Sequence, residues 1–533
     1  MEAPHARELA THGAPQLLAE ILLRFPCPQR VLMVTDGSLD FGTGGFGLSE
    51  FVGIVQGAGH TVSTARRNGG GSASIPGSFN FSTAATPVTT ANYDQVWIFG
   101  FSTAAINVDE RSVIAGFMQS GGGLFATGDH ATIGAGMGAN IPRVNAMRNW
   151  SSVPMFDPER HDTVLNPGAD AIKQFDDQAD TIAQPMYPVF FSNGGPDTAA
   201  ASWSVHPVLR HPAGAVDCLP DHPHESECLA PVPGAGNFAG VEQWPTPIGG
   251  GARIAPVVVG VTVSAGRFIT DLGKPPVRPH SFGAISAYDG DAARVGRIVC
   301  DATWHHFVNI NLNGAGATPD TTMTARTGLY VAGNPTPEYE KIQRYFLNTV
   351  RWLAPRNRRN CWPVLQAALA RFDFEMLEFE LPQPHPCPWD PLQSIGRLAE
   401  DAVTRHWGPG AMAEIVDELL SSGDGSPGLA QLLKPHYGKA ANGRGEPSLL
   451  PLQELRRAVL GAMVNVIAQH LPADEEKLAD ILGDGHDAIV AKLLPEGIRA
   501  AEFAIHDYLE RALKHTRAQA KMIQEGKEAK EAK

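Results

Sequence analysis

A histidine and an aspartate stand together at a turn of small residues in segment 121–134, which reads GGGLFATGDHATIG. The apolar run in this segment is typical of a strand, and Asp129 and His130 follow where that strand would end. Open α/β sheets bind ligands outside the carboxyl ends of their strands. An imidazole near a carboxylate can exchange protons near neutral pH or bind a divalent metal. We therefore expect His130 and Asp129 to face a ligand; the alternative is a histidine in a surface loop.

A second strand runs out into polar residues in segment 296–306, which reads GRIVCDATWHH. It would deliver Asp301, His305 and His306 to the same edge of the sheet. Adjacent residues of an extended segment point to opposite sides, so at most one of the two histidines should face the ligand. We expect it to be His305, and the alternative is that the two histidines form a hydrogen-bonded structural pair.

Asp36 follows the apolar run 30–35 (RVLMVT) and would add a third carboxylate at this edge. The nearby segment 42–47, GTGGFG, has the GxGxxG spacing of dinucleotide-binding loops. In those loops the first glycine follows the strand directly and an acidic residue ends the second strand. Here several residues intervene, and Arg66 and Arg67 stand at the acidic position. We therefore expect no nucleotide cofactor.

Potential metal ligands are dense in segment 218–228, which reads CLPDHPHESEC. Zinc accepts the nitrogen, oxygen and sulfur ligands found there, although the two cysteines lack the CxxC spacing of a zinc knuckle. We expect His222, His224 or Glu225 to complete a site for a divalent metal such as zinc, with His130 and His305 as the first ligands. The alternative is a polar loop that covers the site without a metal.

The elements that must position these residues alternate between apolar runs and helical patterns. Strands are expected at 30–35, 60–65, 95–101, 123–127, 255–263 and 296–300, and helices at 48–56, 109–119 and 338–353. Such alternation predicts an α/β fold with a parallel sheet flanked by helices on both faces. Segments 68–92 and 150–250 are expected to be long loops within it.

The proline-dense segment 381–391 (LPQPHPCPWDP) cannot continue a helix and marks a linker. We expect an α/β domain over 1–355, a linker over 356–391 and an all-α domain over 392–533. Helices of the last domain are expected at 392–405, 411–420, 452–471, 475–482 and 498–514. Their amphipathic faces favour a packed core over a groove for a protein partner.

Charge and cysteine content narrow the class of protein. The net charge of −14 argues against a nucleic-acid-binding surface. No window has the uninterrupted apolar length of a membrane span, and the N-terminus lacks the pattern of a secretory signal. Six scattered cysteines are too few for a disulfide scaffold, so a cytoplasmic, mostly reduced protein is expected.

The turn around 121–134 and the segment 296–306 resemble the class I glutamine amidotransferase-like superfamily, above all its trehalose-utilisation branch. In that branch the turn reads Gly-Gly-Gly, a short strand and Gly-x-His, and a late strand reads Gly-Arg followed by a histidine. Gly128-Asp129-His130, Gly296-Arg297 with His305, and Arg351-Trp352 at the end of the last helix match this pattern. The resemblance covers scattered parts of 30–355. It implies a flavodoxin-like fold and a small polar substrate such as a carbohydrate.

The departures from that family decide the chemistry. Glutamine amidotransferases carry a cysteine at the turn and a His-x-Glu pair later, whereas this chain has His130 at the turn and Phe307 two residues after His305. Without a thiolate nucleophile, glutaminase activity is not expected.

What remains is a hydrolase-like or isomerase-like enzyme for a small polar substrate. In it, His130 and His305 exchange protons or bind metal, and Asp129, Asp36 and Asp301 orient them. The alternative is a binding or scaffold protein that has lost its chemistry and contacts a protein partner through the C-terminal helices.

Overall fold

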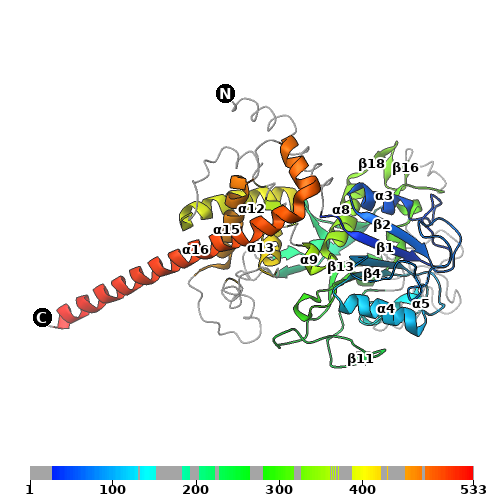
Figure 1. Cartoon of the computed structure of the whole chain (residues 1–533), viewed down its shortest axis with the longest axis horizontal. Coiled ribbons are helices and arrows are strands. Elements are labelled where there is room, and N and C mark those ends of the chain that lie inside the picture. The colour runs from blue at the N-terminus through cyan, green and yellow to red at the C-terminus, as the bar shows by residue number, and fades with distance from the viewer. Residues whose placement is uncertain are drawn as a thin grey trace. The chain divides into compact units, whose positions relative to one another are not determined.

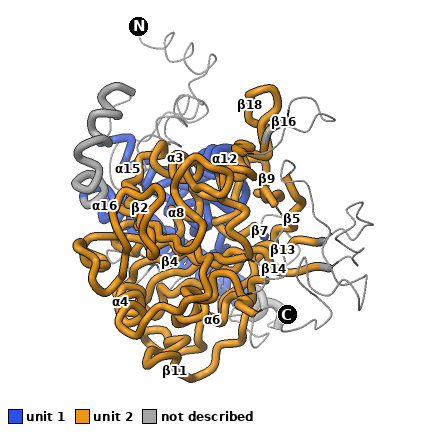
Figure 2. Tube along the Cα trace, turned by 90° about the vertical axis from the view of Figure 1, so that its right-hand side faces the viewer, with its two compact units in different colours: residues 1–25, 192–204, 359–533 blue, residues 26–191, 205–358 orange. Residues whose placement is uncertain are grey.

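The computed structural model describes residues 27–129, 132–151, 183–192, 203–221, 227–264, 280–316, 326–359, 387–421, 450–470 and 475–531, with single positions between 362 and 429. The chain divides into two compact units (Figure 2). The α/β unit comprises Pro26–Phe191 and Val205–Arg358, and the helical unit comprises Met1–Phe25, Ser192–Ser204 and Arg359–Lys533. The change of unit after Arg358 falls inside the segment expected to be a linker, whose exact bounds stay a prediction.

A nine-stranded sheet forms the centre of the α/β unit, in the order β10-β5-β13-β14-β15-β4-β3-β1-β2 (Figure 1). Five neighbouring strands are parallel: β2 (Thr61–Arg66), β1 (Arg30–Thr35), β3 (Gln95–Phe99), β4 (Gly123–Thr127) and β15 (Ile298–Asp301). The other four pair antiparallel: β14 (His280–Tyr288), β13 (Val257–Ser264), β5 (Gln184–Pro188) and β10 (Cys218–Leu219). The expected α/β class is confirmed, but the expectation of a wholly parallel sheet was wrong because the sheet is mixed.

The antiparallel half explains the error. Segment 150–250 was expected to be a loop, yet it supplies β5 and β10. Two of the five residues of β5 are prolines, which weaken any local strand signal. Pairing with β13, in which Met186 lies opposite Thr262, is what makes this segment a strand. By contrast, 68–92 contains no helix or strand, as expected, although it buries Phe79 and Phe81.

Helices cover both faces of the sheet. Along β1, Val31 and Met33 enter one apolar cluster and Leu32 and Val34 enter the other, as the two-residue period of a strand requires. The first cluster includes side chains of α3 (Ser49–Gly57) and α8 (Pro337–Trp352). The second includes side chains of α4 (Val108–Gln119), α5 (Ala135–Gly138) and α6 (Val144–Met147). A ligand of this sheet would therefore bind at the strand ends, as in other open α/β sheets.

Local capping fixes where α4 begins. The helix begins at Val108, one residue before the expected start at 109, and its cap is Asn107: the Asn107 side chain accepts a hydrogen bond from the Glu110 backbone N–H, and the Glu110 carboxylate accepts one from the Asn107 N–H. This reciprocal pair satisfies two backbone donors at the helix start.

Shorter elements complete the description. The remaining short strands are β6 (Phe190–Ser192), β7 (Trp203–Val205), β8 (Arg210–His211), β9 (Gly214–Ala215), β11 (Asn237–Phe238), β12 (Val241–Glu242), β16 (Arg326–Thr327), β17 (Tyr330–Val331) and β18 (Asn334–Pro335). The remaining short helices are η2 (Pro207–Leu209), η3 (Asp291–Ala293), η4 (Trp304–His306), α7 (Asn309–Leu312) and α9 (Arg356–Arg359).

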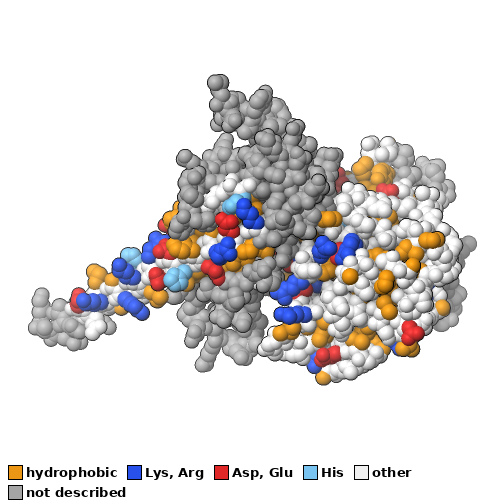
Figure 3. Space-filling model, viewed as in Figure 1, with side chains coloured by type: hydrophobic (Ala, Val, Ile, Leu, Met, Phe, Trp, Pro, Cys, Tyr) orange, Lys and Arg blue, Asp and Glu red, His pale blue; other side chains and the backbone are white. Residues whose placement is uncertain are grey.

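The helical unit contains α12 (Trp389–Trp407), α13 (Ala411–Ser421), α15 (Leu452–His470) and α16 (Glu475–Glu531). The two helices expected at 475–482 and 498–514 are one continuous helix, which includes Pro495. Near the proline, Leu493, Leu494 and Ile498 are buried, so packing compensates for the backbone hydrogen bond that proline cannot make. Further along, basic and acidic side chains alternate on the exposed surface (Figure 3), including the Arg511–Asp507 and Lys521–Glu525 pairs. Within the described part of the chain, no helix combines the length and apolarity needed to cross a membrane.

Candidate functional site

The site begins where two neighbouring parallel strands end. Asp301 of β15 lies opposite Thr127 of β4, so the residues that follow both strands leave the sheet at the same edge. The Trp304 N–H donates to the Gly128 carbonyl over 2.8 Å and joins the two turns. A side chain at Gly128 is excluded, because its Cβ would lie 2.5 Å from the Ile133 carbonyl oxygen.

A buried arginine holds the backbone of both turns. The Arg148 guanidinium donates to the Ala302 carbonyl over 2.6 Å and to the Asp129 carbonyl over 2.8 Å. It also lies over the Trp150 ring, with 4.3 Å from Cζ to the ring centroid. Burial lowers the pKa of Arg148, while Cys228, Asp129, Cys300 and Asp301 oppose that shift. Arg148 therefore holds the backbone at Asp129 and the backbone at Ala302 together.

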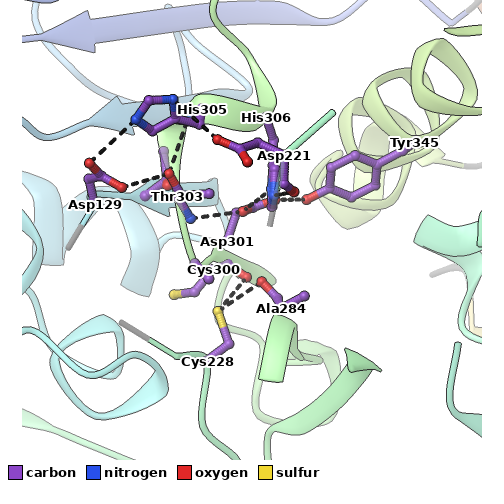
Figure 4. Close-up of polar contacts among 12 residues, drawn as sticks. Asp129, Asp221, Cys228, Ala284, Cys300, Asp301, Thr303, His305, His306 and Tyr345 are labelled. Carbon is purple, nitrogen blue, oxygen red and sulfur yellow. Dashed lines mark hydrogen bonds and ion pairs between the residues drawn. The ribbon is translucent and has the colours of Figure 1, made fainter. Parts of the chain in front are cut away.

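His305 lies at this edge among polar groups (Figure 4). Its Nε2 is 3.6 Å from Asp129 Oδ2, and its Nδ1 is 3.5 Å from Asp221 Oδ2 and 3.4 Å from Asn311 Oδ1. The Thr303 hydroxyl accepts from the His305 N–H over 3.1 Å and donates to Asp129 Oδ1 over 2.8 Å. The His305 side chain is 15% exposed, whereas that of Asp129 is 1% exposed. Thus the imidazole is accessible and the carboxylate behind it is fixed.

Aromatic rings frame His305. The Trp304 ring stacks on it at 4.3 Å, and the half-exposed Phe46 ring meets it edge-on at 6.0 Å. Phe46 belongs to the GTGGFG segment, which Asn309 clamps by donating to the carbonyls of Gly42 and Gly44 over 3.0 and 2.9 Å. The glycine-rich segment thus forms part of the surroundings of His305.

His306 points elsewhere, because residues 304–306 form a 3-10 turn rather than the expected extended segment. Its fully buried ring lies between two oxygens: Nδ1 is 2.6 Å from Asp301 Oδ1, and Nε2 is 2.7 Å from the Asp221 carbonyl oxygen. The Tyr345 hydroxyl donates to Asp301 Oδ2 over 2.7 Å. Of the two histidines, His305 is partly exposed and His306 is buried; that His305 faces a ligand stays a prediction.

The structure brings together some of the expected site residues. Asp129 faces His305, whereas Asp301 engages His306. Asp36 is buried and accepts from the Phe101 and Ser102 N–H groups over 2.6 and 2.8 Å. The expected ligands His130, His222, His224 and Glu225 lie outside the described residues. Among the residues that are described, no three His, Cys, Asp or Glu side chains are grouped to hold a metal ion.

The cysteines close to this region are poor nucleophiles. Cys300, on β15, is buried, and burial raises its pKa to about 12. Burial also raises the pKa of Cys228 well above its ordinary value, and the Cys228 thiol contacts the Ala284 and Cys300 carbonyl oxygens, both at 3.3 Å. Neither thiol is therefore activated as a thiolate. Elsewhere, Cys27 is disulfide-bonded, whereas Cys218, Cys228, Cys300 and Cys387 are free thiols, which is compatible with the expectation of mostly reduced cysteines.

Sequence reasoning did not single out Asp221, Thr303, Asn311 or Tyr345 as site residues. Asp221 stands in segment 218–228, whose many potential metal ligands could have indicated a site residue there. Tyr345 lies on α8, where the helical pattern marks it only as a core residue. Its contact with Asp301 spans 44 residues and has no local signature.

The arrangement can perform acid–base chemistry. An accessible imidazole backed by a fixed carboxylate can take up a proton, and the carboxylate then stabilises the positive charge.

The chain was compared with models of known protein families and with curated proteins, and it matches none of them.

Proposed function

We propose that the α/β unit is a hydrolase-like or isomerase-like enzyme in which His305 is the general acid/base. The observation that carries this proposal is the His305–Asp129 pair, with 3.6 Å between Nε2 and Oδ2, at the carboxyl ends of β4 and β15. Asp129 holds the charge of the protonated ring. Asp221 adds a second carboxylate, so a neutral polar substrate such as a carbohydrate suits the site better than an anion.

The strand order supports a flavodoxin-like, amidotransferase-like origin for this unit. The parallel half runs β2-β1-β3-β4-β15, which is the 2-1-3-4-5 order of flavodoxin-like sheets. The trehalose-utilisation branch is the proposed relative, on the strength of the turn and late-strand motifs. The raised pKa values of Cys228 and Cys300 support the exclusion of glutaminase chemistry, which needs a thiolate.

A divalent metal such as zinc is the alternative role for the same residues, because a ring nitrogen that binds a metal ion has no lone pair left to exchange a proton. Ligand atoms on one tetrahedral zinc ion lie roughly 3.4 Å apart, and the 3.6 Å between His305 Nε2 and Asp129 Oδ2 is compatible with a shared ion. His130 and one of His222, His224 or Glu225 would complete the set. Such an ion would lower the pKa of a bound water to roughly 7.

The enzyme proposal is tested with 4-nitrophenyl esters and glycosides as substrates, with and without chelator. His305→Ala and Asp129→Asn should each lower turnover by about 100-fold or more without changing the thermal midpoint. His515→Ala, at an exposed position of α16, is the control and should keep full turnover. Turnover retained by His305→Ala would contradict the acid/base role.

The metal proposal has its own measurement. Elemental analysis should find a divalent metal in the wild type and less in His130→Ala and His305→Ala. Metal content that both variants retain would remove the metal from the proposal.

A second candidate is a binding protein without catalysis, with the helical unit contacting a protein partner. The absence of an activated thiol among the described cysteines favours it. If the wild type turned over none of the substrates, the binding protein would remain as the proposed function.

We also propose a cytoplasmic location, against which the disulfide at Cys27 argues. Alkylation of Cys27 in freshly lysed cells, with and without reductant, tests the location. Alkylation without reductant would support the cytoplasm, and alkylation that needs reductant would argue against it.

A further inference from the structure

The buried His306 lies next to His305, the proposed general acid/base, and contacts the backbone of Asp221, whose carboxylate faces His305. A backbone carbonyl can only accept, so the 2.7 Å contact between His306 Nε2 and the Asp221 oxygen requires a proton on Nε2 that His306 donates. The other ring nitrogen lies 2.6 Å from Asp301 Oδ1. Asp301 is in turn held by the Tyr345 hydroxyl and by the Thr303 N–H, over 2.7 and 3.2 Å. The ring of His306 therefore has one orientation, set from both sides.

Asp221 joins this network to His305. Its carbonyl accepts from His306, and its carboxylate Oδ2 lies 3.5 Å from His305 Nδ1 (Figure 4). The strand that precedes Asp221 is β10, and β5, β13 and β14 separate β10 from β15 in the sheet. Strand pairing therefore does not itself bring Asp221 to His305, and the hydrogen bond from His306 is a contact that holds the Asp221 backbone beside His305.

We propose that His306, held by Asp301 and Tyr345, is a positioning residue that sets the Asp221 carboxylate against His305. Asp221 and Asp129 then face the two ring nitrogens of His305 and fix the orientation of the imidazole. The catalytic role of this orientation rests on the proposed function. The effect of His306 on the surroundings of His305, exerted through Asp221, does not depend on that function.

The test is the ring ¹⁵N spectrum of His305 in histidine-labelled full-length protein at one pH, with its signals assigned by their loss in His305→Ala. Asp221→Asn should shift the His305 Nδ1 resonance, and His306→Ala should shift it in the same direction. The double variant should show no more than the larger single shift, because both changes remove one interaction.

Two tyrosines of α8 provide a matched pair if His306→Ala fails to fold. Tyr345→Phe removes only the hydroxyl that holds Asp301 and should give a smaller shift in the same direction. Tyr339→Phe removes a hydroxyl that donates to Glu50 instead and should leave the His305 resonances unchanged.

Wild-type His305 resonances in Tyr345→Phe and in any folded His306→Ala protein would overturn the proposal, as would additive shifts in the double variant. The spectrum needs no substrate, so its outcome is separate from turnover. Coupled shifts with full turnover in His305→Ala would refute the enzyme and leave the positioning role intact. Lost turnover in His305→Ala without coupled shifts would support the enzyme and refute the positioning role of His306.

Discussion

The histidines of this chain differ in their exposure and in the charged groups around them. His305 is accessible between two carboxylates, whereas His60 lies in an environment that penalises charge. The Nδ1 of His60 accepts a hydrogen bond from the Gln29 N–H over 3.1 Å. Burial lowers the pKa of His60 from 6.5 to about 4, and burial likewise lowers that of His206 to about 3.

The lowered pKa of His60 predicts acid sensitivity. Between about pH 6.5 and pH 4, the unfolded ring binds a proton that the folded ring does not, so stability falls as pH decreases through this window. The difference between a pKa of 6.5 and one of about 4 corresponds to at most roughly 3.5 kcal/mol in the free energy of unfolding. His60→Asn keeps an acceptor for Gln29 but cannot titrate, so its unfolding free energy should fall less steeply with decreasing pH.

Urea unfolding at pH 7, 5.5 and 4.5 measures this slope. His515→Asn, at an exposed position, should keep the wild-type slope. If His60→Asn and the wild type lose equal stability on acidification, His60 is not a source of the acid sensitivity.

At the scale of elements, the glycine-rich segment 42–47 depends on close backbone contact. A Cβ at Gly47 would lie 1.9 Å from the Gly42 carbonyl oxygen and 2.9 Å from the Asn309 amide nitrogen. Gly47→Ala must therefore displace this segment, and with it Phe46 beside His305. We expect a loss of roughly 1–3 kcal/mol in the free energy of unfolding.

A second glycine serves as the matched control. A Cβ at Gly53, inside α3, would meet nothing within 4 Å. Gly53→Ala should stabilise the protein by roughly 0.5–1 kcal/mol, because alanine loses less backbone entropy in a helix. Chemical denaturation compares the two variants, and a Gly47→Ala protein as stable as the wild type would show that the segment adapts.

At the scale of the molecule, the two units predict how the chain responds to protease. The α/β unit ends at Arg358, and the proline-dense segment 381–391 follows. We expect a low-specificity protease to cut within 381–391 and to leave a folded N-terminal fragment. The digest should include reductant, because Cys27 is disulfide-bonded.

Mass spectrometry and circular dichroism of the fragment measure this outcome. Cuts spread over the α/β unit, with no surviving N-terminal fragment, would mean that the two units fold only together.

Local patterns in the amino-acid sequence were enough to predict strands in the parallel half of the sheet. Strands at 30–35 and 123–127 occur with those bounds, because a strand buried on both faces is a continuous apolar run that local composition reveals. The runs at 123–127 and 296–300 located Asp129 and His305 just beyond the strand ends, where parallel strands deliver side chains to one edge.

The tertiary structure decided the rest. Strands such as β5 and the short β10 have little local signal, and they form because partners distant in sequence satisfy their backbone groups. The contact between His306 and Asp221 joins residues 85 positions apart, and it depends on how the chain returns from β10 to β15. Periodicity and spacing describe neighbours along the chain, whereas the surroundings of His305 are set by neighbours in space.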